Sequence, residues 1–331
     1  MKYRNLGAGS LNVSVLSFGA WQIGDPNYWG ADAEKDGLEA VHAALDAGIN
    51  FFDTAEMYGK GESERALGKA LSGKRDHAFI ASKFWPDHSE PAKLRQACED
   101  SLKRLGTDYL DLYQVHWPSR DVPFEAVYAE MQLLKDEGKI RHIGVSNFGR
   151  QDLMSWLGTG SCVSDQLGYN LLFRAIEHEI LPACIERNVG VLVYMPLLQG
   201  TLSGRWKTIE EIPMLRRRTR HFSSTREGVR HGEPGCEDLL SSALNQLGAL
   251  ADELRQPLAT LALAWVIAQP GITSAIIGAR DARQLKRNLA AADLDLTPDT
   301  LSRLDEITVP IKQQLGSNPD LWLTTTGSRI R

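Results

Sequence analysis

Short apolar segments recur along this chain and alternate with longer stretches that have helical spacing. Eight of the short segments fall at residues 15–18, 50–53, 78–83, 110–116, 142–146, 164–167, 191–194 and 274–277. Several carry β-branched or aromatic residues, which is typical of strands buried on both faces of a parallel sheet. The pattern therefore predicts eight parallel strands.

Between these segments, apolar residues recur every three or four positions and a glycine follows the last of them. Leu38, Val41 and Leu45 share one helix face in this way. A glycine after the final helical turn supplies the left-handed residue of a helix C-cap. The glycines predicted to do so are Gly48, Gly106, Gly138 and Gly190. Further helices are predicted over residues 259–268, 282–292 and 297–307, the last with Thr297 as N-cap and Pro298 behind it.

The repeated strand and helix pattern shows no break in composition, so it predicts a single domain over residues 1–331 folded as a (β/α)8 TIM barrel, an α/β class. Residues 1–16, with Gly-Ala-Gly-Ser at 7–10, read as an N-terminal β-hairpin. An open doubly wound sheet is the alternative. Against it, no strand is followed by GxGxxG, and no phosphate-binding P-loop is present.

One long irregular segment, residues 200–238, follows the seventh predicted strand. Between residues 205 and 231 it carries eight Lys or Arg against three Glu. Two interpretations stay open: a solvated basic loop, or a clamp over an anionic ligand at the mouth of the barrel. The segment is therefore a candidate cofactor-covering loop.

Composition narrows the class of protein. A formal net charge of −5 over 331 residues opposes general nucleic-acid binding, and no stretch is long and apolar enough for a membrane span or a secretory leader, so we expect a cytoplasmic protein. The cysteines form no CxxC pair, which predicts neither a metal site nor a redox motif but small buried side chains. They are Cys98, Cys162, Cys184 and Cys236.

Four polar residues stand at or just after the ends of predicted strands: Asp53, Tyr58, Lys83 and His116. In a barrel the carboxyl ends of the strands converge, so these side chains are expected to meet. The set suits carbonyl reduction, because the developing alkoxide needs a proton and nearby positive charge. We expect Lys83 to lower the pKa of Tyr58, Asp53 to keep Lys83 charged, and His116 to orient the carbonyl oxygen.

Other interpretations of these residues remain. A Lys–Asp pair at strand ends is often purely structural. Lys83 could alternatively form a Schiff base in an aldolase or isomerase.

The chain resembles the aldo-keto reductase superfamily over most of residues 1–310, and within it the bacterial reductases and the potassium-channel β-subunit branch. The matching stretches are GINFFDTA at 48–55 with Tyr58-Gly59 and ESE at 62–64, Ser82-Lys83, LKRLGTDYLDLYQVH at 102–116, GKIRHIGVSNF at 138–148 and IGAR at 277–280. The resemblance implies a reductase of aldehydes, ketones or sugars, with the four polar residues as its catalytic tetrad and Tyr58 as proton donor.

The resemblance also implies NADP(H) as cofactor, with NAD(H) as the alternative. The nicotinamide amide would be held by Ser146, Asn147 and Gln166, with the ring on Tyr194. The remaining implied cofactor residues are Gly19, Trp21, Pro196, Leu197, Gln199, Gly200, Arg205, Gly278, Ala279, Arg280, Gln284 and Asn288. Arg280 would face the 2′-phosphate, and the start of the following helix would add backbone N–H donors. Met195 departs from the small polar residue that relatives often carry.

Aromatic residues near the predicted mouth are candidates for the substrate pocket. They are Trp21, Tyr28, Trp29, Trp85, Trp117 and Trp322, of which Trp85 and Trp117 adjoin tetrad members and are preferred. The expected partner is a small carbonyl compound. A nicotinamide-sensing regulatory subunit with little turnover is the second functional hypothesis. The pattern leaves open the oligomeric state and whether a tail over residues 311–331 closes the pocket.

Overall fold

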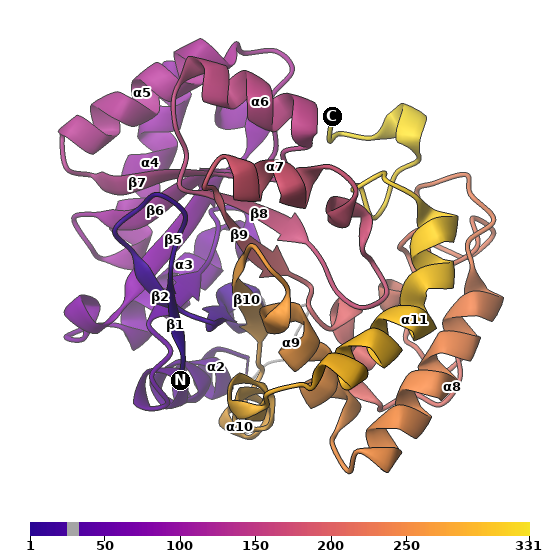
Figure 1. Ribbon diagram of the computed structural model, residues 1–331. Coiled ribbons are helices and arrows are strands. Elements are labelled where there is room, and N and C mark those ends of the chain that lie inside the picture. The colour runs from indigo at the N-terminus through magenta and orange to yellow at the C-terminus, as the bar shows by residue number, and fades with distance from the viewer. Residues whose placement is uncertain (25–32) are drawn as a thin grey trace.

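The eight predicted strands close into a barrel in the computed structural model, which describes residues 1–24 and 33–331. All neighbouring strands are parallel, in the order β10-β3-β4-β5-β6-β7-β8-β9 (Figure 1). Their bounds are β3 Leu16–Gly19, β4 Phe51–Asp53, β5 Phe79–Phe84, β6 Leu110–Val115, β7 Ile140–Ser146, β8 Ser164–Gly168, β9 Gly190–Tyr194 and β10 Ile272–Gly278. The (β/α)8 TIM barrel predicted from the sequence is thus confirmed, and the open sheet is wrong.

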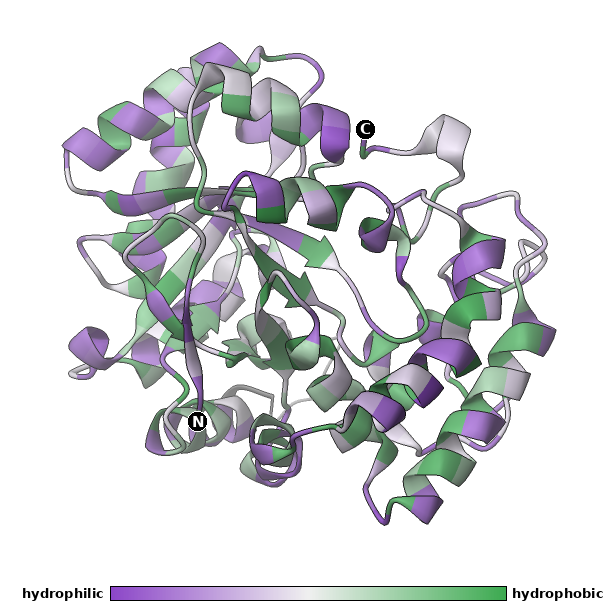
Figure 2. Cartoon of the chain, viewed as in Figure 1, coloured by the Kyte–Doolittle hydropathy of each residue, from purple (hydrophilic) through white to green (hydrophobic). Residues whose placement is uncertain are grey.

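Helices surround the strands and present polar residues outward, while the strands at the centre are apolar (Figure 2). Their bounds are α2 Ala33–Asp46, α3 Glu62–Ala70, α4 Pro91–Leu105, α5 Phe124–Asp136, α6 Arg150–Thr159, α7 Ile180–Glu186, α8 Glu237–Glu253, α9 Leu258–Ala268, α10 Ala282–Leu289 and α11 Pro298–Leu315. Three of them, α3, α6 and α8, have no counterpart among the helices expected from the sequence, although Gly160 follows α6 and a buried apolar stripe runs along α8.

The N-terminal hairpin closes one end of the barrel. Strands β1 (Tyr3–Asn5) and β2 (Asn12–Ser14) pair antiparallel around the Gly-Ala-Gly-Ser turn. Leu6, Leu11 and Val13 join Phe51 and other inward-facing residues of the strands in one buried cluster. A Cβ on Gly7 would stand 2.3 Å from the carbonyl oxygen of Val163, so the hairpin lies against the start of the strands. The opposite, C-terminal end is left for a site.

The expected ends of α7 and α11 differ from the structure. After α7, Asn188 takes the left-handed conformation (φ 52°), and Gly190 already belongs to β9, so Gly190 is not the predicted cap. Asparagine tolerates this conformation because its short side chain can hydrogen-bond locally. Helix α11 starts at the predicted Thr297 cap, whose hydroxyl accepts from Thr300 N, but it runs past Pro310 to Leu315.

The extension of α11 has a packing explanation. A proline inside a helix removes one backbone hydrogen bond and costs about 3 kcal/mol. Ile311 and Leu315 lie in the turn after Pro310 and are buried in the main core. Burying two such side chains contributes roughly 1.5–3 kcal/mol each and offsets that cost. Residues 311–315 of the expected tail are therefore helical.

Candidate active site

The four polar residues singled out by the sequence meet at the C-terminal end of the barrel. Asp53 is the last residue of β4, Lys83 lies near the end of β5, and His116 directly follows β6. Tyr58 opens a 3₁₀ turn after β4. Gly59 in that turn has φ 58°, and a Cβ there would stand 2.4 Å from Gly24 O, so this position requires glycine. The turn returns the phenol of Tyr58 toward the strand ends.

Lys83 is the centre of the cluster. Its Nζ is fully buried and donates to Asp53 Oδ1 at 2.7 Å, to the Thr54 carbonyl at 2.9 Å and to Tyr58 Oη at 3.4 Å. Burial alone would lower the pKa of Lys83, but Asp53 and Tyr58 outweigh it and hold that pKa above its usual range. The ammonium therefore stays charged. A second set of donors, Gln166 Nε2 at 2.8 Å and Gln114 Nε2 at 3.5 Å, satisfies Asp53 Oδ2.

The pKa of Tyr58 is raised, which corrects the expectation that Lys83 would lower it. Burial is the largest influence and disfavours the phenolate; Lys83 acts downward as expected, while Asp53 acts upward. The charge of Lys83 alone predicts a lowered pKa, and the loss of water around the hydroxyl reverses that effect. At neutral pH the phenol therefore carries its proton and can donate it.

His116 completes the cluster as a neutral ring. Burial, assisted by the charge of Lys83, lowers its pKa well below the usual range. The ring stands edge-on to Tyr58, with centroids 5.8 Å apart, and to Trp85 at 5.2 Å. Its Nδ1 is buried and has no hydrogen-bond partner within the described part of the chain. Neutral imidazole beside a phenol and an ammonium can hydrogen-bond a carbonyl oxygen without adding charge to the resting site.

Four residues expected to hold a nicotinamide form a connected network at the ends of β7, β8 and β9. Ser146 Oγ donates to the Gln166 carbonyl at 2.9 Å, and Asn147 Nδ2 donates to Ser146 Oγ at 3.1 Å. Tyr194 Oη donates to Asn147 Oδ1 at 2.8 Å, and Asn147 Nδ2 also reaches the His116 carbonyl at 3.0 Å. Through Gln166, this network is bonded to Asp53 of the polar cluster.

The chain that leaves β9 is locally strained. Met195, Leu198 and Gln199 have φ of 53°, 44° and 53°, and Gly200 has φ 93°, with Pro196 and Leu197 between them. Side-chain-bearing residues in this region cost about 1–3 kcal/mol each and are concentrated at ligand-binding segments. Thr201 Oγ1, directly after them, is buried without a partner among the described residues. This segment fits a polar ligand, and Thr201 was not singled out from the sequence.

The expected adenosine-side residues gather around the end of β10 and the start of α10. Gly278 pairs with Gly19 of β3, and a Cβ on Gly278 would overlap the side-chain amide of Gln22, a residue that sequence reasoning missed. Ala279 follows, fully buried. Asn288 Nδ2 is buried with no partner in the described structure. These small and polar groups fit one end of an extended ligand.

Arg280 lies just before α10 and is not part of it. It precedes the N-cap Asp281 and so lies outside α10, which means it does not share a helix face with Gln284 and Asn288. Arg280 is nevertheless close to Gln284, because its backbone N–H donates to Gln284 Oε1 at 3.1 Å. The Asp281 carboxylate accepts from Gln284 N at 2.7 Å, so one helix N–H donor is already satisfied. The α-helix ends at Leu289, three residues before the predicted end.

The basic loop makes contacts both within itself and to other segments of the chain. Arg216 donates to the Gln199 carbonyl at 3.0 Å, and Arg226 pairs with Glu237 and Glu210. Arg220 pairs with Glu233. Arg205 is exposed, and its backbone N–H bonds Ser203 Oγ. Of the eight cations that suggested a clamp, Arg220 and Arg226 are therefore engaged in ion pairs within the structure.

The two preferred pocket residues line one surface hollow of about 680 Å³. Trp85 and Trp117 share it with the C-terminal residues Arg329 and Arg331. Trp322 lies close by, 6.5 Å from Trp117 between ring centroids, and Trp21 lies 6.3 Å from Tyr58. The other two aromatic candidates, Tyr28 and Trp29, fall outside the described residues.

Glu56 is a further polar residue that sequence reasoning missed. Its Oε1 accepts from the backbone N–H of Trp85 at 2.7 Å and contacts His88 Nδ1 at 2.8 Å. It thereby joins the turn that carries Tyr58 to the segment after β5. The sequence signal that could have identified Glu56 is its position between Asp53 and Tyr58.

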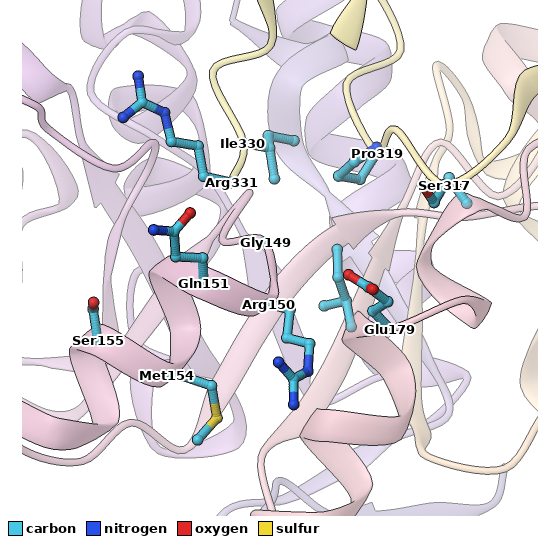
Figure 3. Close-up of a pocket in the computed structure, with 12 residues that line it drawn as sticks. Gly149, Arg150, Gln151, Met154, Ser155, Glu179, Ser317, Pro319, Ile330 and Arg331 are labelled. Carbon is cyan, nitrogen blue, oxygen red and sulfur yellow. The ribbon is translucent and has the colours of Figure 1, made fainter.

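A second hollow, of about 620 Å³, lies between α6, α7 and the C-terminal segment (Figure 3). Gly149 and Arg331 face each other at its edge, with Ile330 and Pro319 beyond them. No residue expected at the active site lines it. This hollow lies where the C-terminal segment packs against the rest of the protein.

Other classes of site find no support in the described residues. All four cysteines are free and buried, and burial raises the pKa of the Cys98 thiol to about 12, so it is not a reactive thiolate. Within residues 1–24 and 33–331, no three His, Cys, Asp or Glu side chains lie close enough together to hold a metal ion. None of the helices described is both long and apolar enough to cross a membrane.

Comparison with known proteins points in one direction. Residues 15–309 match the model of the Aldo/keto reductase family. The aldo-keto reductase YhdN of Bacillus subtilis is 37% identical over 301 residues, which are 86% of this chain and 87% of the relative. The methylglyoxal reductase YeaE of Escherichia coli is 33% identical over 302 residues, 90% of this chain and 92% of the relative. A crystal structure of an aldo-keto reductase from Klebsiella pneumoniae in complex with NADPH has a TM-score of 0.74 and 32% identity, covering 93% of this chain and 95% of its own.

Proposed function

The chain belongs to the aldo/keto reductase family, and from this membership and the geometry of its polar cluster we propose that it reduces small aldehydes or ketones to alcohols with NADP(H), Tyr58 donating the proton. The observation that carries the proposal is the buried ammonium of Lys83, which contacts both Asp53 Oδ1 at 2.7 Å and Tyr58 Oη at 3.4 Å. The proposed substrate class includes sugar carbonyls.

Bound NADPH would supply a hydride to the carbonyl carbon. The proton for the carbonyl oxygen would come from Tyr58 Oη, whose raised pKa keeps it loaded at neutral pH. Lys83, 3.4 Å away, would stabilise the phenolate that remains, and Asp53 holds Lys83 charged and in place. His116 would direct the carbonyl oxygen toward Tyr58 through a hydrogen bond from its neutral ring.

The residues proposed to bind the cofactor are those grouped above at the ends of β7 to β10. Ser146, Asn147 and Gln166 offer both donors and acceptors for a carboxamide, and Tyr194 offers an aromatic face. The unpartnered Thr201 and Asn288 fit polar groups further along an extended ligand. NADP(H) is preferred over NAD(H) because a related reductase binds NADPH and because Arg280 is exposed beside the start of α10.

The two alternative activities have less support. A Schiff-base lysine needs a neutral amine, and the pKa of Lys83 is raised rather than lowered. A regulatory subunit with little turnover would not require the tetrad to be complete, whereas here all four members are in contact.

The test replaces Tyr58 by phenylalanine, which keeps the ring and removes the proton. With NADPH and either methylglyoxal or 4-nitrobenzaldehyde, we expect kcat to fall by about 10²–10⁴, the usual contribution of a general acid, while NADPH affinity is nearly unchanged. Cofactor oxidation and fluorescence titration measure the two quantities. Tyr128→Phe removes a phenol on α5 and serves as the control. Normal turnover of Tyr58→Phe would refute the proposed donor.

A further inference from the structure

One buried arginine joins the covering loop, defined as residues 200–238, to the strap, defined as residues 316–331 after α11. The Arg220 side chain is 4% exposed, and its Nε bonds both carboxylate oxygens of Glu233 at 2.9 and 3.0 Å. Its other two nitrogens donate to the carbonyls of Asn318 at 3.0 Å and Leu315 at 2.9 Å. The backbone N–H of Arg220 also bonds the Leu321 carbonyl at 2.9 Å.

The strap is a folded segment rather than a loose end. Asp320 is fully buried and accepts from the backbone N–H groups of Trp322 at 3.0 Å and Leu323 at 3.2 Å. It also pairs with Arg329 at 3.0 Å. The position of residue 322 therefore depends on where residues 318–321 lie, which are the residues bonded to Arg220.

The far end of the strap is fixed to α6. The Arg331 N–H donates to Asp152 Oδ2 at 2.8 Å, and the Asp152 N–H donates to the Arg331 carbonyl at 3.0 Å. Arg120 bonds the same carboxylate and the Arg329 carbonyl at 2.7 Å. Figure 3 shows Arg331 beside Gly149 at the start of this helix. The strap is thus held by the covering loop at one end and by α6 at the other.

Between these attachments the strap supplies an aromatic wall. The Trp322 ring lies parallel to Tyr194, with an interplanar angle of 6° and centroids 6.5 Å apart, and also faces Trp117 at 6.5 Å. Arg329 places its guanidinium 3.7 Å over the Trp117 ring. Trp322 therefore lies between Tyr194, the residue proposed to face the nicotinamide, and Trp117, one of the two preferred pocket residues.

We propose that Arg220 is a positioning residue that couples cofactor binding to substrate binding, by tying the covering loop to the strap that carries Trp322. When NADP(H) binds beneath the covering loop, the bonds from Arg220 hold residues 315–321 to that loop and so set the wall against which the carbonyl compound packs. The bonds go to main-chain carbonyls, so they fix the path of the strap whatever its side chains. This inference rests on the proposed function, because it requires a cofactor beneath the loop.

Hydrogen exchange with and without NADP⁺ tests the coupling directly. In the unaltered enzyme, NADP⁺ should slow exchange in both the covering loop and the strap. In Arg220→Lys, which keeps the charge but not the forked set of donors, it should slow exchange in the covering loop alone. Arg303→Lys is the matched control, because Arg303 makes a two-bond pair with Glu253 and has no bond to the strap in the described structure.

Kinetics supply the second measurement. KM for 4-nitrobenzaldehyde should rise by about 5- to 150-fold in Arg220→Lys, the range of typical coupling between sites, with NADPH affinity little changed. Trp322→Ala should raise the same KM, and the double variant should be no worse than Trp322→Ala alone, since Arg220 acts through Trp322. If Arg220→Lys fails to fold, Glu233→Gln, which loosens Arg220 without removing it, should shift KM in the same direction.

The possible results distinguish failure of the Arg220 coupling from failure of the proposed function. If NADP⁺ slows exchange nowhere, the proposed function fails. If it protects the covering loop but not the strap of the unaltered enzyme, or protects the strap equally in Arg220→Lys, the function stands and the coupling is wrong. Additive effects of Arg220→Lys and Trp322→Ala on KM would likewise overturn the role of Arg220.

Discussion

At the scale of single residues, burial is the largest influence on the pKa values of Tyr58 and His116. Lys83 is the cation closest to Tyr58, yet the pKa of that phenol is raised because the hydroxyl has lost its water. The same desolvation, with Lys83 added, lowers the pKa of His116 well below its usual range. The two groups therefore rest in their neutral forms, one loaded with a proton and the other able to hydrogen-bond without charge.

This arrangement predicts an unusually flat pH profile for reduction. An ordinary histidine and an ordinary tyrosine would give limbs near about pH 6.5 and about pH 10. Here Tyr58 loses its proton only above its usual range, and His116 gains one only well below its own. We expect kcat/KM, which reports the free enzyme, to show no limb near about pH 6.5 or about pH 10 when measured at constant ionic strength. A limb near about pH 6.5 that vanishes in His116→Asn would contradict this.

At the scale of elements, the attachment of the strap to α6 depends on a glycine. A Cβ on Gly149 would stand 2.2 Å from the Arg331 carbonyl oxygen, so Gly149→Ala must displace the end of the strap. We expect faster hydrogen exchange at residues 329–331 and weaker binding of the carbonyl substrate. Unchanged exchange there would show that the contact is unimportant.

The same helix provides the control for that substitution. Gly158 of α6 has open space around its Cβ position. Gly158→Ala should raise the free energy of unfolding by roughly 0.5–1 kcal/mol, because alanine loses less backbone freedom in a helix. Urea unfolding measures this, and substrate binding should not change.

Elements also show where local sequence signals suffice. The Thr297 cap is visible as Thr-Pro before an apolar stripe, and the structure confirms it. The end of α11 is not visible, because Pro310 suggests a stop that the buried Ile311 and Leu315 override. Helix ends follow local rules only where tertiary packing does not oppose them.

At the scale of the whole molecule, a buried histidine in the covering loop makes the free energy of unfolding depend on pH. His221 is fully buried, with Nε2 2.8 Å from the Leu172 carbonyl and Nδ1 3.0 Å from Thr219 Oγ1, and burial lowers its pKa to about 4. The unfolded chain has a histidine pKa of about 6.5. The stabilisation is therefore complete above the unfolded value and is lost as pH falls from there through the folded value.

The titration of His221 should therefore lower the free energy of unfolding by about 3 kcal/mol as the pH falls from above the unfolded pKa to below the folded one. Urea unfolding at several pH values should show the decline in the unaltered protein and a smaller slope in His221→Gln. His178→Gln, at an exposed position, should keep the original slope. Parallel curves for all three proteins would exclude His221 as the cause.

The sequence by itself determined the barrel and the grouping of the polar cluster. Both follow from local order: apolar segments of strand length alternate with helical stretches, and parallel strands must end at one mouth. Asp53, Lys83 and His116 could therefore be brought together without knowing the packing, since each stands at or beside the end of such a segment.

Only the tertiary structure decided how that site is tuned and covered. The raised pKa of Tyr58 depends on exclusion of water by side chains distant in sequence. The bonds of Arg220 to Leu315 and Asn318 join positions about a hundred residues apart. Nothing in the local pattern distinguishes Arg220 from the other arginines of its loop. Long-range contacts and burial carry no local periodicity, and so they appear only once the chain is folded.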